Sequence, residues 1–193
     1  MRLPAAERRE QLLHTAVAVF AEHGYHATSM NDVAEAAGVT KPVLYQHFES
    51  KKELYQALLD EVGARILAAI RDATRGVTDG RRQTELGFRA YFRWVAEDQA
   101  AFTLLYDNGA RVDEEFNRAR RGVTSAMARA VAPLIAADID DEHRLTLAHA
   151  LVGLAEGASR RLVELGADFD PDEVARQVSE LAWAGLRSVH RRS

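Results

Sequence analysis

Apolar residues recur along this chain at the three- and four-residue spacing of an α-helix, and no long segment alternates apolar with polar side chains. A first stripe, Leu13, Ala16, Val17 and Phe20, lies within residues 5–23. This spacing places the four side chains on one helical face, whereas a half-buried strand requires a period of two. The sequence therefore predicts an all-α fold.

Capping residues and helix breakers divide this pattern into about nine predicted helices. Gly24 ends the first helix, and Ser29 with Asp32 forms an S-x-x-D capping box that opens the second. Pro133 is expected to kink or end a long helix, and Asp170 caps the last one. The predicted helices cover roughly residues 5–23, 29–37, 40–48, 50–75, 81–97, 99–106, 112–137, 141–165 and 171–190.

Composition excludes several classes of function. The chain has 193 residues and no Cys, so disulfides, thiol nucleophiles and Cys-based metal sites are absent. Its histidines show neither the HExxH pattern nor the i, i+4 spacing of metal ligands, and the chain contains no Gly-rich phosphate loop and no G-x-S-x-G motif. We therefore expect no enzyme activity, no cofactor and no metal.

The sequence also indicates where in the cell the protein resides. No apolar stretch is long enough to cross a bilayer, and the N-terminus lacks the apolar core of a signal peptide. We expect a cytoplasmic protein without membrane partners.

Two short helices joined by a tight turn are predicted between residues 29 and 48. Small apolar residues, Val33, Ala34 and Ala37, lie on the first helix, and Leu44 and Phe48 lie four apart on the second. Small residues allow two short helices to cross closely, as a helix-turn-helix requires. The outer face of the second helix then presents side chains that can reach base edges or phosphates in a major groove, namely Lys41, Val43, Tyr45, Gln46 and His47.

The N-terminal quarter of the chain, about residues 8–55, resembles the DNA-binding domain of the TetR family of transcriptional regulators. The matching residues are Ala16 to Phe20, Gly24-Tyr25, Thr28-Ser29, Asp32 to Ala34, Ala37 to Val39, and Leu44 to Phe48 with Lys51 and Leu54. The resemblance implies a three-helix helix-turn-helix DNA-binding domain over residues 1–53. A larger helical domain for ligand binding and dimerisation would follow over residues 54–193.

The resemblance also implies roles for single residues. Asn31, Lys41, Pro42 and Val43 match positions that contact bases, and Tyr45, His47 and Lys51 match positions that contact phosphates. Gln46 pairs with an adenine or faces a phosphate. The expected DNA-binding set is Thr28, Ser29, Asn31, Thr40, Lys41, Pro42, Val43, Tyr45, Gln46, His47 and Lys51.

Charge does not by itself indicate DNA binding. The formal net charge is −4, and residues 1–53 hold no surplus of Lys and Arg over Asp and Glu. Affinity for DNA must therefore come from local placement of charge. The alternative interpretation is a solvated helix face without contact to DNA.

Aromatic residues concentrate in the middle of the chain, where Phe88, Tyr91 and Phe92 share one helical face. Ordinary core packing explains most of them, and a ligand pocket lined by aromatics with a few polar groups is the functional alternative. Glu156 either faces such a pocket or, as we favour, pairs with Arg160 or Arg161. The candidate ligand-binding residues are Phe88, Tyr91, Phe92, Phe102, Leu105, Tyr106, Phe116, Arg120, Leu154 and Glu156.

The resemblance further implies that the last two long helices, predicted over residues 141–165 and 171–190, form a four-helix bundle with a second copy. Gly153 and Gly157 are four residues apart and make a strip that allows close approach of helices. The candidate dimer residues are Leu147, Leu151, Gly153, Gly157, Val178, Leu181, Trp183 and Leu186.

Together these features predict a ligand-responsive, DNA-binding transcriptional regulator, most simply a repressor. As a homodimer it would bind a palindromic operator in double-stranded DNA, and a small hydrophobic or aromatic effector would release it. Two other classes are weighed against this one. A helical protein-interaction module would bind no specific DNA, and an enzyme would need a catalytic constellation that the sequence lacks.

Overall fold

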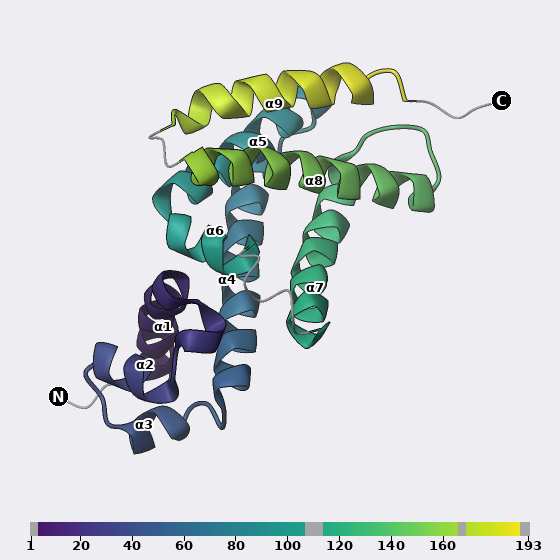
Figure 1. Cartoon of the computed structure of the whole chain (residues 1–193). Coiled ribbons are helices and arrows are strands. Elements are labelled where there is room, and N and C mark those ends of the chain that lie inside the picture. Colours follow the sequence, from purple (N-terminus) through teal and green to yellow (C-terminus); the bar gives the residue numbers. More distant parts are fainter. Residues whose placement is uncertain (1–3, 107–113, 166–168, 190–193) are drawn as a thin grey trace. The chain divides into compact units, whose positions relative to one another are not determined.

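The computed structural model describes residues 4–106, 114–165 and 169–189, without the side chains at 114–116 and 163–165. The described residues form nine α-helices and one short 3₁₀ helix and contain no strand, which confirms the all-α fold (Figure 1). The helices are α1 Ala5–Ala27, α2 Met30–Ala36, α3 Lys41–Tyr45, α4 Lys51–Thr74, α5 Gly80–Glu97, α6 Gln99–Tyr106, α7 Glu114–Val131, η2 Ala132–Leu134, α8 Asp141–Leu165 and α9 Pro171–Leu186.

The chain divides into two compact units. The N-terminal unit comprises residues 1–62 and 100–121, and the C-terminal unit comprises 63–99 and 122–193. Helix α6 therefore packs with the N-terminal unit, and the Tyr55 hydroxyl donates a 3.3 Å hydrogen bond to the Leu104 carbonyl. The predicted boundary between a DNA-binding domain and a ligand-binding domain, at residues 53 and 54, is a division by function. The two compact units do not test it, so it stays a prediction.

Gly24 interrupts α1 where the sequence predicts its end. Its φ of 76° and ψ of 164° are not helical, and one further turn follows before Thr28. A positive φ favours glycine because a Cβ would be strained there. The apolar stripe of α1 forms the core of this unit, since Leu12, Leu13, Ala16, Val17 and Phe20 are all buried.

Two local motifs define α2. The Ser29 side chain accepts from the Asp32 amide, and the Asp32 carboxylate accepts from the Ser29 amide at 2.7 Å, which confirms the capping box. The hydrogen bond from the Ser29 amide is the main cause that holds the pKa of Asp32 below its usual value, and the bond with the Ser29 side chain adds to it. At the other end, Val39 N–H donates to the Ala34 carbonyl and Gly38 N–H to the Glu35 carbonyl. This is a Schellman motif, and Gly38 takes its left-handed position with φ of 65°.

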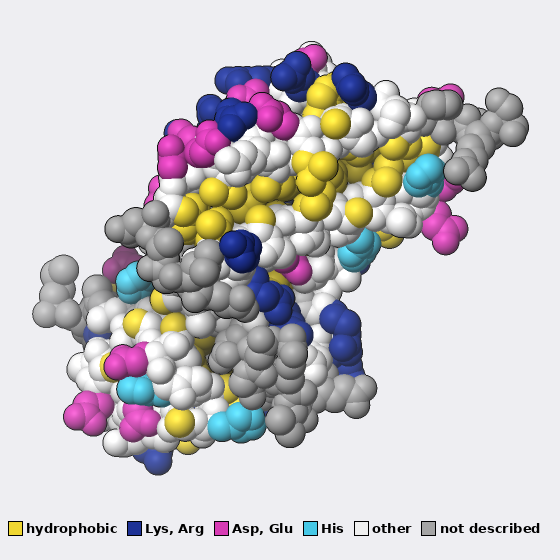
Figure 2. Space-filling model, turned by 45° about the horizontal axis from the view of Figure 1, so that its top comes forward, with side chains coloured by type: hydrophobic (Ala, Val, Ile, Leu, Met, Phe, Trp, Pro, Cys, Tyr) yellow, Lys and Arg dark blue, Asp and Glu magenta, His cyan; other side chains and the backbone are white. Residues whose placement is uncertain are grey.

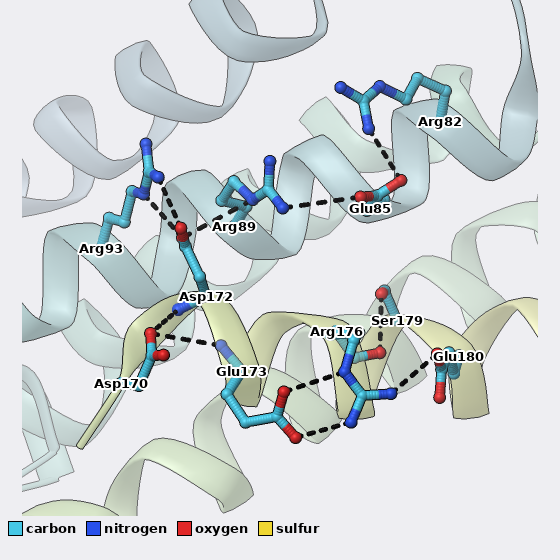
Figure 3. A network of polar contacts seen from close by, with 10 residues as sticks. All are labelled: Arg82, Glu85, Arg89, Arg93, Asp170, Asp172, Glu173, Arg176, Ser179 and Glu180. Carbon is cyan, nitrogen blue, oxygen red and sulfur yellow. Dashed lines mark hydrogen bonds and ion pairs between the residues drawn. The ribbon is translucent and has the colours of Figure 1, made fainter.

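The C-terminal unit is built on the pairing of α5 with α9. The two helices run antiparallel: Arg93 near the end of α5 bonds Asp172 at the start of α9, and Gly80 at the start of α5 lies against the Trp183 ring near the end of α9. Figure 3 shows the polar network along this pair, in which Arg93 and Arg89 both reach Asp172. The predicted Asp170 cap of α9 is confirmed, because its side chain accepts from the Asp172 and Glu173 amides.

Pro133 ends α7, as the sequence predicts, although the helix is shorter than its predicted range. We expected a helix over residues 112–137, but α7 ends at Val131 and Pro133 lies in the 3₁₀ turn that follows. Proline has no amide hydrogen and clashes with the preceding helical turn, so α7 cannot continue past it. The carbonyls of Ile135, Ala137 and Ile139 are instead bound by the Arg144 guanidinium of α8.

Candidate functional site

Helices α2 and α3 are held together by a fully buried apolar contact. Val33 and Leu44 are 0% exposed, and Phe48 just beyond α3 is also fully buried. The Arg9 guanidinium of α1 lies 4.9 Å from the centre of the Phe48 ring and covers it. The predicted inner faces of the helix-turn-helix are therefore confirmed, and they fix the tilt of α3 against its own unit.

The backbone of α3 is short but continues beyond its formal end. The helix spans Lys41–Tyr45, and the Gln46 and Phe48 amides still donate to the Pro42 and Leu44 carbonyls. Thr40 occupies the N-cap position, yet its side chain makes no cap hydrogen bond. Helix α3 therefore ends at Tyr45, three residues before the predicted end, and a hydrogen-bonded turn leads on to Phe48. Thr40 is exposed at the start of the helix.

The outer face of α3 is open to solvent. Tyr45 is 42% exposed and is one of only two large apolar side chains that lie exposed in the described part of the chain. The Lys41 ammonium lies 5.9 Å from the centre of the Tyr45 ring. Most of the predicted DNA-binding set is exposed, namely Ser29, Asn31, Thr40, Lys41, Pro42, Tyr45 and Gln46, while Val43 and His47 are half-buried.

Thr28 and Lys51 make hydrogen bonds within their own unit, and their predicted DNA contacts stay a prediction. The Thr28 side chain is 1% exposed, and its hydroxyl donates to the Gly24 carbonyl at 2.9 Å. The Lys51 ammonium donates to the Tyr25 carbonyl at 2.8 Å and the Thr28 carbonyl at 2.9 Å, and lies 4.3 Å from the centre of the Tyr25 ring. Both side chains therefore hold the segment that leads from α1 into α2.

The C-terminal unit contains a partly open cavity of about 80 Å³. Its wall is almost entirely apolar, with Gln83, Thr84 and the Tyr91 ring as its polar members. The complete lining is Ile70, Gln83, Thr84, Gly87, Phe88, Tyr91, Met127, Val131, Leu134, Ile135, Leu151, Val152, Ala155 and Leu186. The cavity thus joins faces of α4, α5, α7, α8 and α9 with the short η2 helix.

Of the predicted ligand-binding residues whose side chains the structure describes, only Phe88 and Tyr91 line this cavity. Phe92 is fully buried core, and Phe102, Leu105 and Tyr106 are buried in the N-terminal unit. Three more predicted residues do not line it either: Leu154 is half-buried, Glu156 accepts a hydrogen bond from Thr124, and Arg120 bonds Asn117. The Phe116 side chain lies outside the described residues. Sequence reasoning missed the aliphatic lining, because residues such as Met127 and Ile135 carry no signal beyond apolarity.

The predicted dimer residues are divided between two environments. Gly153, Gly157 and Leu181 are exposed, and Leu147 and Val178 are half-buried. Figure 2 shows the hydrophobic side chains of α8 and α9 as a continuous band on one face of the C-terminal unit. Leu151 and Leu186 instead line the cavity, and Trp183 packs against Gly80 of α5.

The described residues hold neither a cluster of metal ligands nor a membrane-spanning helix. Among the residues that the structure describes, no three His, Asp or Glu side chains gather where a metal ion could be held. No helix in the described ranges is long and apolar enough to span a membrane.

Two family models match the chain, one near each end. Residues 12–58 match the family described as "Bacterial regulatory proteins, tetR family", and residues 81–185 match "Tetracyclin repressor-like, C-terminal domain". The chain is 36% identical over 190 residues to the HTH-type transcriptional activator FasR of Mycolicibacterium smegmatis, covering 97% of this chain and 87% of FasR.

Solved structures agree with this assignment. A TetR-like transcriptional regulator from Rhodococcus sp. RHA1 is 28% identical with a TM-score of 0.78, covering 97% of this chain and 100% of that one. FadR from Bacillus subtilis, solved in complex with stearoyl-CoA, is 17% identical and shares the fold with a TM-score of 0.79, covering 91% of this chain and 98% of that one. The chain therefore belongs to the TetR family of DNA-binding transcriptional regulators.

Proposed function

We propose that this regulator binds a palindromic operator as a homodimer, each copy placing α3 in a major groove, and that an apolar effector releases it. The observation that carries the proposal is that the outer face of α3 is open to solvent while its inner face is fully buried against α2. A protruding helix held rigidly in this way is the element that helix-turn-helix proteins insert into DNA. The two-fold symmetry of a dimer requires two related half-sites about one helical turn apart.

The exposed residues of α3 suit different parts of a DNA duplex. Lys41 can donate to guanine, and Pro42 and Val43 can contact a thymine methyl group. Tyr45 and His47 supply donors for phosphates, Gln46 serves a base or a phosphate, and Asn31 lies on α2 beside them. The exposed Ser29 and Thr40 hydroxyls flank this face, whereas we assign Thr28 and Lys51 a positioning role.

The test of this interface is binding to the DNA that flanks the protein's own gene. Lys41→Ala should alter the preferred sequence, and Tyr45→Ala should weaken binding to every sequence. Arg71→Ala, which removes an exposed positive charge from α4, is the matched control and should change neither property. Unchanged affinity and preference in both α3 variants would refute the assignment. A folded dimer that binds no DNA at low salt would favour the protein-interaction alternative.

The exposed band on α8 and α9 supports the dimer. Leu181 is 64% exposed, and a Cβ at Gly153 or Gly157 would meet no atom within 4 Å. A large apolar side chain that is open in one copy is expected to be covered by another. Leu181→Glu should therefore yield monomers in sedimentation experiments, whereas Arg129→Glu on the exposed face of α7 should leave the dimer intact. Dimers of unchanged stability in the Leu181 variant would exclude this face.

The cavity of the C-terminal unit supports an apolar effector. Its volume of about 80 Å³ is smaller than the roughly 150 Å³ of an apolar cavity that admits benzene. A ligand must therefore displace lining side chains, and the flexible Met127 is the easiest to move. Because the ligand would then favour an expanded conformation, its binding can shift the equilibrium between two states of the protein.

We propose a long acyl chain as the effector, since FadR from Bacillus subtilis was solved with stearoyl-CoA and the lining here is almost entirely apolar. Stearoyl-CoA should release the operator complex, and coenzyme A without the acyl chain should not. Val152→Trp, which fills the cavity, should remain bound to DNA in the presence of stearoyl-CoA. A reporter gene then determines the sign of regulation, for which we expect repression.

A further inference from the structure

A second concave site lies on the outside of the C-terminal unit, along the α5–α9 pair. It is a groove of about 310 Å³, and its main side chains are Arg81 and Glu85 of α5 with Arg176, Glu180, Trp183 and Arg187 of α9 and its C-cap. None of its lining residues lines the internal cavity. The groove is therefore a separate site from the cavity to which the effector was assigned.

The charges of this groove are unevenly paired. Glu85 is bound by Arg82 at 3.0 Å and by Arg89 at 3.6 Å, and Glu180 is bound by Arg176 at 3.0 Å (Figure 3). Both carboxylates of the groove are thus already neutralised by neighbouring guanidinium groups.

Arg81 and Arg187 remain as positive charges in this groove. Within the described residues, neither guanidinium has an acidic partner, and both side chains are exposed. Arginine presents a planar fork of donors that matches the oxygens of a phosphate. Two such groups in one groove, with the nearby acids already paired, favour an anion that carries phosphate.

Trp183 adds an aromatic surface to the same groove. The edge of its ring rests on Gly80, with its Cζ3 atom 3.3 Å from the place a Cβ would occupy. Gly80 thus leaves room for the ring, and Trp183 is half-buried with part of its surface in the groove. Tryptophan rings bind planar bases by stacking.

From this combination we propose that the α5–α9 groove binds a nucleotide, with Arg81 and Arg187 holding its phosphates and Trp183 contacting the base. Free nucleotides and the nucleotide part of coenzyme A share this chemistry. The site is distinct from the DNA-binding face, because its residues belong to the C-terminal unit and none of them lies on α2 or α3.

Calorimetry and tryptophan fluorescence of the full-length protein test the proposal, with ADP as the probe. The chain has two Trp residues, and Trp94 is only 6% exposed, so Trp183 is the ring that a ligand in the groove contacts, and the part of the fluorescence change that Trp183→Phe removes reports on it. ADP should bind and alter the emission, while adenosine and pyrophosphate should each bind at least about tenfold more weakly. Coenzyme A is the second probe: tighter binding than ADP would assign the site to a coenzyme A ester, and equal or weaker binding would assign it to a free nucleotide.

Matched double variants distinguish binding in the groove from non-specific attraction of ADP to positive charge. Arg81→Ala with Arg187→Ala should weaken ADP binding by about a hundredfold, about tenfold for each lost charge-assisted contact. Arg71→Ala with Arg129→Ala removes the same charge from exposed positions of α4 and α7 and should leave ADP binding unchanged. Trp183→Phe should retain phosphate binding but lose the fluorescence response.

Several results would overturn the proposal. These are an absence of ADP binding to the wild-type protein, equal losses in the two double variants, and adenosine binding as tightly as ADP. If pyrophosphate binds as tightly as ADP and leaves the emission unchanged, the base does not contribute to binding and the assignment of Trp183 is wrong. Binding of operator DNA is measured separately, so failure here leaves the proposed function untouched.

Discussion

Replacing Lys51 by Met distinguishes a positioning role from a phosphate contact. The Lys51 ammonium donates to the Tyr25 and Thr28 carbonyls at 2.8 and 2.9 Å. It thereby joins the start of α4 to the segment between α1 and α2. Methionine preserves most of the apolar stem but removes the donors and the charge, so Lys51→Met tests the ammonium rather than the packing.

The expected loss of unfolding free energy follows from these contacts. A hydrogen bond from a charged group contributes roughly 1.5–3 kcal/mol when buried, and the interaction with the Tyr25 ring adds about 0.5–1 kcal/mol. Both carbonyls are only partly buried, so water replaces much of what is lost. We expect Lys51→Met to destabilise the protein by about 1–2 kcal/mol, measured as a shift in the denaturant midpoint at unchanged slope.

The salt dependence of operator binding supplies the decisive measurement. If Lys51 of each copy neutralised one phosphate, its loss would reduce the slope of log affinity against log salt by about 0.9 per copy, or ~1.8 per dimer. A positioning lysine lowers affinity at every salt concentration and leaves the slope unchanged, which is our expectation. A reduced slope with unchanged stability would refute the reasoning. Lys52→Met, at the adjacent exposed position, is the control for charge.

Three further predictions follow from local geometry. Ser29→Ala should cost about 1 kcal/mol of stability by removing the cap of α2, measured by denaturant unfolding, and an unchanged midpoint would contradict the capping role. Gly63→Ala should destabilise by about 1–3 kcal/mol, because its Cβ would lie 2.8 Å from Val123 Cγ1, whereas Gly122→Ala meets no atom within 4 Å and should be neutral or stabilising. Hydrogen bonds from Arg176 and Gln177 lower the pKa of Glu173 to about 2, and those from Arg93 lower the pKa of Asp172. A carboxyl whose pKa is lower in the folded than in the unfolded state stabilises the fold above the unfolded pKa, and this stabilisation is lost as the pH falls toward the folded pKa. Glu173→Gln removes this contribution. In thermal scans from pH 5 to about 2, Tm should therefore decrease less for Glu173→Gln than for the wild type, and an equal decrease would contradict the assignment.

Local signals explain which parts of the fold could be predicted. The Ser29–Asp32 capping box and Gly24 each act through hydrogen bonds or dihedral angles within a few residues, so sequence alone located them. The inner residues of the helix-turn-helix were equally accessible, because helical spacing determines their shared face. Tyr45 was assigned to the outer face on the same grounds, and its side chain is exposed.

Non-local packing explains what sequence alone did not reveal. The cavity is lined by residues from helices far apart in the chain, and an aliphatic residue such as Ile135 has the same local pattern whether it faces a cavity or a packed core. Phe102 and Tyr106 are equally apolar but belong to the other unit. The partners of Lys51 lie 23 and 26 residues upstream, beyond any pattern read within one helix.

The antiparallel pairing of α5 with α9 has a consequence for biosynthesis. The ribosome releases α5 well before α9, so the face of α5 that α9 covers has no native partner until synthesis is nearly complete. Helices α1 to α3 pack against neighbours close in sequence and can assemble early. Premature termination before Pro171 would therefore yield a nascent polypeptide with an uncovered apolar surface, a substrate for chaperones and proteases rather than a shortened regulator.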